Sequence, residues 1–221
     1  MNPNLTEAIL NAVGRSASDG LFLKKNSSAN GGLDWGTPTA TDNDLDHEAQ
    51  KLGMVAVPFS PYAVNHTDLG LSAGYAIGQL IRPGNALMTN AIMWLAAAGT
   101  GASGENKMFL TDESFKVLAV TADISTQLAD NSNNGTFLEV PFLTPYQGVK
   151  GLNYFVGVLS HMSVNPTVGG ILDGGGVAVP KYKTHWPAFE ISSVSTVPAV
   201  NSSFSSGSVV AAPASYFFAS S

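Results

Sequence analysis

From Leu69 to the last residue, the chain repeats one pattern of short apolar runs separated by turn-forming residues. The runs include AGYAIGQLI, NKMFLTD, FKVLAVTAD and NYFVGVLSHM, and the separators include RPGN, GTGASGE and DNSNNG. Many short strands with turns at this spacing are typical of antiparallel sandwiches and barrels, and not of alternating strands and helices. The sequence therefore predicts a mainly β fold, a β-sandwich, for residues 67–221.

The run at residues 154–162, YFVGVLSHM, predicts where one strand lies in its sheet. Successive side chains of a strand point to opposite faces, and here both faces are largely apolar early in the run. A strand with two apolar faces is buried on both sides. We therefore expect it to be a central strand.

A short helix is predicted near the N-terminus, over residues 4–15. Asn4 or Thr6 can cap it, and Leu5, Ile9 and Val13 recur at helical spacing on one side. A helix of this length is marginal by itself in water, so its apolar stripe needs a partner. The partner could be the chain's own domain, or other copies of the chain and a larger assembly.

Residues 16–66 are the least regular part of the sequence. LFLKK and LDW can form two short strands around the turn-rich NSSANGG, and an acidic connector rich in Pro and Thr follows. The next apolar piece, MVAVPFSPY, contains two prolines that cannot donate to a strand ladder. We expect residues 1–66 to be an extended arm for attachment and oligomerisation.

Composition narrows the classes of partner. Charged residues make up only 12% of the chain, the formal net charge is −6, and the ten Lys and Arg residues are scattered. Nucleic-acid binding needs a basic face, so we expect none. The absence of cysteine excludes disulfides and cysteine-based zinc sites.

Neither the N-terminal segment nor the most apolar run of the chain has the features of a targeting or membrane-spanning signal. The N-terminal MNPNLTEAILNAVGRSAS lacks the basic region and long apolar stretch of a signal peptide. The run ALMTNAIMWLAAAGTG reaches glycine too early to span a bilayer, and it contains Asn90. We expect no membrane insertion, and synthesis in a cytoplasm without a classical export signal.

The chemical motifs that the sequence could contain are weak or missing. The four histidines form no metal-binding pair, and neither HExxH nor GxSxG occurs. GTGASGE lacks the Lys-Ser/Thr of a phosphate loop and is interpreted as a hairpin turn, as is the region of Asp112 and Glu113. The sequence therefore predicts that the protein is not an enzyme and has no catalytic residue, metal or cofactor.

One loop combines aromatic and polar side chains that could contact a ligand. In VPKYKTHWPAF, Tyr182, His185 and Trp186 lie close together in the sequence. Aromatic rings stack on sugar faces and supply contact area at low entropic cost. These three residues are candidates for binding a host cell-surface glycan; the alternative is that Trp186 fills the end of the core.

The segment DGLFLKKNSSANGGLDWGT resembles an element of phage fibre and minor tail proteins. The resemblance runs through Asp-Gly, a short hydrophobic strand, paired lysines, a Ser/Asn/Gly turn and a final Trp35. In that family the element lies in the arm between a virion-bound N-terminus and the distal domain, often at a trimer axis. The resemblance implies that three copies bury Leu21, Leu23, Leu33 and Trp35 against each other; an ordinary exposed hairpin is the alternative.

Residues 69–221 are similar to the jelly-roll-type β-domain of tail and fibre proteins from phages that infect actinobacteria. The similarity is carried by the order and spacing of NKMFLTDESFKVLAVTADIS, VPFLTPYQGVKGLNYFVGVLSHM and the closing strand near Tyr216. It implies a trimeric virion structural protein that binds other virion proteins and presents a jelly-roll-like sandwich for host-surface adhesion. The alternatives are a capsid decoration or head fibre protein, and a monomeric carbohydrate-binding module.

Overall fold

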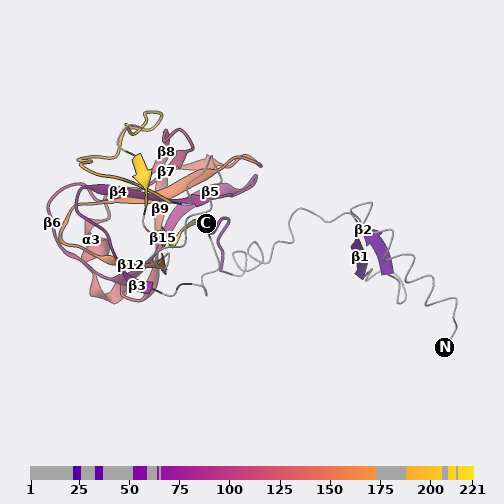
Figure 1. The fold of residues 1–221 in the computed structure, drawn as a ribbon, viewed down its shortest axis with the longest axis horizontal. Coiled ribbons are helices and arrows are strands. Elements are labelled where there is room, and N and C mark those ends of the chain that lie inside the picture. Colours follow the sequence, from indigo (N-terminus) through magenta and orange to yellow (C-terminus); the bar gives the residue numbers. More distant parts are fainter. Residues whose placement is uncertain are drawn as a thin grey trace. The chain divides into compact units, whose positions relative to one another are not determined.

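A computed structural model describes residues 22–25, 33–36, 52–58, 64, 66–172, 188–205, 209–212 and 214–221. The chain divides into two compact units, Met1–His47 and Glu48–Ser221 (Figure 1). The helix predicted over residues 4–15 lies outside the described residues. Residues 52–58, which the sequence assigns to the arm, belong to the same unit as the predicted sandwich.

The first unit contains a two-stranded antiparallel hairpin. Its strands are β1 (Phe22–Lys25) and β2 (Leu33–Gly36). Leu23 lies opposite Trp35 in the register, and Lys24 lies opposite Asp34. The two short strands predicted around the NSSANGG turn are confirmed.

The first sheet of the second unit has six antiparallel strands in the order β14-β13-β4-β10-β7-β8. Their bounds are β4 (Tyr75–Ile81), β7 (Lys107–Asp112), β8 (Val117–Val120), β10 (Tyr154–Ser160), β13 (Ala188–Ile191) and β14 (Val209–Ala211). Every residue of β10 is buried between β4 and β7. The central strand predicted from the two apolar faces is confirmed, and so is the hairpin turn that follows Asp112.

The second sheet follows the order β15-β12-β5-β16, with β3 added to β12 and β9 added to β5. Its strands are β3 (His66–Gly70), β5 (Leu87–Ala97), β9 (Thr136–Gln147), β12 (Thr167–Leu172), β15 (Ala214–Tyr216) and β16 (Phe218–Ser220). The isolated bridge between Thr121 and Phe142 joins this sheet to the end of β8.

Three smaller elements differ from the sequence expectations. GTGASGE was expected to be a hairpin turn, but its residues form β6 (Thr100–Ala102), which pairs with β11 (Met162–Val164). The expectation was wrong because β5 and β7, on either side of this segment, belong to different sheets. A short helix, α3 (Ser125–Ala129), and a 3-10 helix (Asn131–Asn133) were not predicted, since elements of this length show no apolar periodicity.

The main core lies between the two sheets. Alternate residues of β9 are buried and exposed, so Leu138, Val140 and Phe142 point inward. They meet inward side chains of both sheets, among them Met93, Leu95, Met108, Leu110, Val156, Val158 and Phe218. Burying apolar side chains from two facing sheets is the main stabilising term of a sandwich. The predicted mainly β sandwich is confirmed.

A second apolar cluster covers the outer face of the first sheet. It contains Phe109, Phe155, Phe189 and Phe204, all buried. Residues 192–205 supply the cover and hydrogen-bond to β8 and to the turn before it: Val117 N donates to Ser202 O at 2.8 Å, and Phe204 N donates to Phe115 O at 3.0 Å. The first sheet is therefore apolar and protected on both faces.

The outer face of the second sheet is partly covered by the segment that leads into it. Ala56 pairs with Ser220, and Met54 packs with Ile92, Phe217 and Ala219. The side chains of Met54 and Ala56 are almost fully buried. These residues are part of the sandwich, so the β-unit begins earlier than residue 67.

At Phe217 the chain changes its pairing partner within the second sheet. β15 pairs with β12, and after Phe217 the chain continues as β16, which pairs with β5. The Phe217 backbone bridges both, because its N–H donates to Gly169 O at 2.9 Å and its carbonyl accepts from Trp94 N at 3.4 Å. Both backbone polar groups of Phe217 are therefore hydrogen-bonded where the pairing partner changes.

Candidate functional site

The sequence-predicted site residues fall mostly outside the described part of the chain. Tyr182, His185 and Trp186 lie outside the described residues, and their role in surface binding stays a prediction. Among the oligomerisation candidates, Leu5, Ile9, Val13 and Leu21 also lie outside it. Leu23, Leu33 and Trp35 have a described backbone, which places them in the β1–β2 hairpin.

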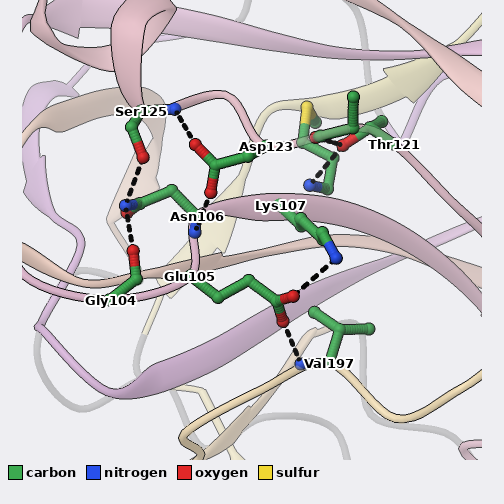
Figure 2. A network of polar contacts seen from close by, with 10 residues as sticks. Gly104, Glu105, Asn106, Lys107, Thr121, Asp123, Ser125 and Val197 are labelled. Carbon is green, nitrogen blue, oxygen red and sulfur yellow. Dashed lines mark hydrogen bonds and ion pairs between the residues drawn. The ribbon is translucent and has the colours of Figure 1, made fainter.

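A network of polar contacts in the sandwich surrounds Asn106 (Figure 2). Its side chain is fully buried just before β7, and its Nδ2 donates to Gly104 O at 3.1 Å and to Ser125 Oγ at 2.9 Å. Its Oδ1 accepts from the backbone N–H of His161 at 2.7 Å. A buried amide is tolerated because both ends of it are hydrogen-bonded. Asn106 thereby ties three separate loops together.

Asp123 accepts two backbone hydrogen bonds in the same network. Its Oδ2 accepts from Asn106 N at 3.0 Å and its Oδ1 from Ser125 N at 2.9 Å. Desolvation favours the neutral acid, but the hydrogen bonds from Ser125 and Asn106, with the charge of Lys107, outweigh it and lower the pKa of Asp123. Asp123 is therefore a carboxylate that holds a turn in place.

Glu105 and His161 hydrogen-bond to residues 192–205, the segment that covers the first sheet. Glu105 Oε2 accepts from Val197 N at 2.6 Å, while Oε1 pairs with Lys107 Nζ at 2.5 Å (Figure 2). His161 Nε2 lies 2.7 Å from Val194 O and donates to it, since a carbonyl oxygen can only accept. Both contacts reach the stretch 192–205 that covers the first sheet.

The close fit at His161 depends on a glycine. A Cβ added at Gly104 would lie 2.9 Å from Cγ of the His161 ring. That distance is closer than carbon atoms pack, so a larger residue would displace the ring from its hydrogen bond with Val194.

The geometry of this cluster is suited to holding loops, not to proton transfer. The carboxylates of Asp123 and Glu105 are both occupied by backbone N–H groups, and general acid or base chemistry needs a group aimed at a substrate. Within the described residues, no group of three or more His, Asp or Glu side chains could hold a metal ion. The carboxylate of Asp112 likewise caps its own turn, accepting from Ser114 and Lys116.

Only part of this network has a local signal in the sequence. Asp123-Ile-Ser125 has the spacing of an Asx turn, in which the carboxylate accepts from the N–H two residues on. Asn106 has no such local signal, because its partners come from residues 104, 125 and 161.

Comparison with models of known protein families and with curated proteins finds no match for this chain. In the part of the chain that the structure describes, no helix is long and apolar enough to cross a membrane.

Proposed function

We propose that the chain is a structural protein of a bacteriophage virion, of the tail-fibre or minor-tail type. In this proposal the N-terminal arm attaches the protein to other virion proteins and trimerises, and the sandwich is presented for adhesion to the host surface. The protein would act in the virion by binding alone.

The β1–β2 hairpin is the observation that carries the proposal. It has four residues in each strand and belongs to a unit separate from the sandwich. An isolated two-stranded hairpin is at best marginally stable in water, so such a hairpin gains stability from a further surface. Copies of the same hairpin around an axis supply that surface and bury the row that contains Leu23 and Trp35.

The construction of the sandwich supports a role in presentation. Its first sheet is packed on both faces, and hydrogen bonds at Asn106 and His161 hold the surrounding loops. A domain held at this many points can carry binding surfaces without rearranging when it binds. The resemblance of residues 19–35 to the arm element of phage fibres gives the same assignment.

Light scattering on the full-length chain and on a truncated chain that begins at Glu48 tests the proposal. Glu48 is the appropriate start because Met54 and Ala56 belong to the sandwich. We expect the full-length protein to have about three times the mass of one chain, and the truncated protein to be a folded monomer.

Two results would contradict the arm's role: a monomeric full-length protein, or a truncated protein that still trimerises. The monomeric result would favour an isolated binding module. Immunogold labelling of phage particles then locates the protein, since label on the tail supports the fibre assignment and label on the head supports a decoration or head fibre protein.

A further inference from the structure

The outer face of the second sheet carries a small exposed surface where β5 and β9 pair. In the antiparallel register, Trp94 lies opposite Phe137 and Ile92 lies opposite Glu139. Leu138 points into the core, so Phe137 and Glu139 on either side of it point outward. Two residues of a strand span about 7 Å, which places an aromatic ring and a carboxylate side by side on one face.

The ring of Phe137 is exposed and yet held in place. It keeps 38% of its surface in contact with solvent. Its centroid lies 5.3 Å from Trp94 in an edge-on arrangement and 5.4 Å from Phe217. A ring already fixed by two aromatic neighbours loses little conformational entropy when a ligand packs on it.

The polar half of the surface presents open hydrogen-bond acceptors. Glu139 Oε1 accepts from Asn90 Nδ2 at 2.9 Å and from the hydroxyl of Ser221. Asn90 Nδ2 also donates to Ser221 Oγ at 2.9 Å and to Thr89 Oγ1 at 3.1 Å. Within the described residues, Glu139 Oε2 and Asn90 Oδ1 make no hydrogen bond, so both remain available to donors from outside.

The charges of this face restrict what can bind there. β5, β9 and β16 contain no Lys or Arg, and Glu139 is the acidic residue among them. An anionic ligand would therefore meet a carboxylate with no cation on these strands to pair with it. A neutral ligand that brings hydroxyl donors meets no such penalty.

We propose that Phe137, Glu139 and Asn90 form a binding site for a neutral glycan. The apolar C–H face of a pyranose packs on the Phe137 ring, whose π-face is electron-rich. Hydroxyl groups at the edge of the same sugar donate to Glu139 Oε2 and Asn90 Oδ1. In the proposed function this site is the adhesive surface, and its ligand class is the neutral glycans. Its place at the host surface rests on that proposed function. Three copies of the site in a trimer would add avidity.

Calorimetric titration of the full-length protein tests the site. The probes are cellohexaose, maltohexaose and mannohexaose as neutral glycans, with hexagalacturonate as the anionic counterpart. The variants are Phe137→Ala, Phe137→Trp and Glu139→Ala, and Leu143→Ala is the matched control because it removes another exposed apolar side chain of β9. Thermal unfolding of each variant checks that it is folded.

We expect at least one neutral hexasaccharide to bind and hexagalacturonate not to bind. Phe137→Ala should weaken binding about tenfold and Glu139→Ala about fivefold, because they remove the stacking surface and a charged acceptor. Phe137→Trp, which keeps an aromatic face, and Leu143→Ala should bind like the wild type.

Three results would overturn the site: no binding of any neutral probe, equal binding by folded Phe137→Ala, or equal loss in Leu143→Ala. Light scattering on the same samples separates this outcome from failure of the proposed function. A trimer that binds no glycan overturns the site alone, whereas a monomer that binds glycan through Phe137 supports the site and contradicts the trimeric arm.

Discussion

The ring of Phe189 lies directly over Gly78, so that a methyl group added at Gly78 would stand 2.3 Å from Cε1 of Phe189. Gly78 pairs with Gly157 on the next strand, and the ring of Phe109 lies in the same way over Gly157. Across four strands the order is Phe189, Gly78, Gly157, Phe109. The two glycines leave the space into which both rings fold.

Replacing these glycines by alanine should destabilise the sandwich to different degrees. At Gly157 the new methyl group would meet the backbone oxygen of Ile77 at 2.3 Å, whereas at Gly78 it meets a side-chain ring that can shift. We expect Gly157→Ala to cost about 3 kcal/mol in the free energy of unfolding and Gly78→Ala about 1 to 2 kcal/mol. Urea unfolding measures both. Gly70→Ala is the control, since nothing lies within 4 Å of its added methyl group.

Asn106→Ala should be among the most destabilising polar substitutions. It removes a fully buried amide, and with it the acceptor of the His161 N–H and the donor to Gly104 O and Ser125 Oγ. We expect a loss of about 2 to 4 kcal/mol in the free energy of unfolding. Asn131→Ala, at an exposed position, should change it by less than about 0.5 kcal/mol. Equal losses of unfolding free energy in the two variants would contradict a stabilising role for the Asn106 network.

Stability at alkaline pH should depend on Tyr216. Burial, together with the nearby charge of Glu190, raises the pKa of Tyr216 to about 12. The folded state therefore keeps a proton that the unfolded state loses above pH 10, so this stabilisation is complete below pH 10 and is lost as pH rises toward 12. Between pH 9 and pH 11, the wild type should lose about 1.4 kcal/mol more than Tyr216→Phe in urea unfolding. Parallel pH curves for the two proteins would contradict this assignment.

Stability at acidic pH should depend on Asp123 in the opposite sense. Its pKa is lowered in the folded state, so its stabilisation is present at neutral pH and is lost as pH falls below about 4, through the folded-state pKa. Asp123→Asn should therefore unfold at a lower temperature than the wild type at pH 7, with the difference shrinking toward pH 2. A difference that persists unchanged at pH 2 would show that the amide disturbs packing instead.

Features set by neighbours in the sequence could be predicted. The two apolar faces of residues 154–160 identified a central strand, and the polar residues after Asp112 identified the turn between β7 and β8. Both depend on local alternation or turn chemistry, which one stretch of sequence contains in full.

Features set by distant residues could not be predicted. The pairing of β6 with β11 and of Ala56 with Ser220 joins segments far apart in the chain, and no periodicity encodes a partner. The same holds for the proposed glycan site. Phe137 and Glu139 are visible in the sequence as alternate residues of one strand, but Trp94 and Asn90 reach them only through the register of β5 with β9.

The position of β16 has a consequence for how the protein is made. Residues 218–220 are far from Ala56 in the sequence, yet the strand that they form lies inside its sheet, between β5 and Ala56. Until residues 218–220 leave the ribosome, β5 and Ala56 both lack the strand that pairs with them. The apolar outer face around Ile92 is then uncovered. The second sheet can therefore close only after residues 218–220 have been synthesised, so its folding joins segments that lie far apart in the sequence.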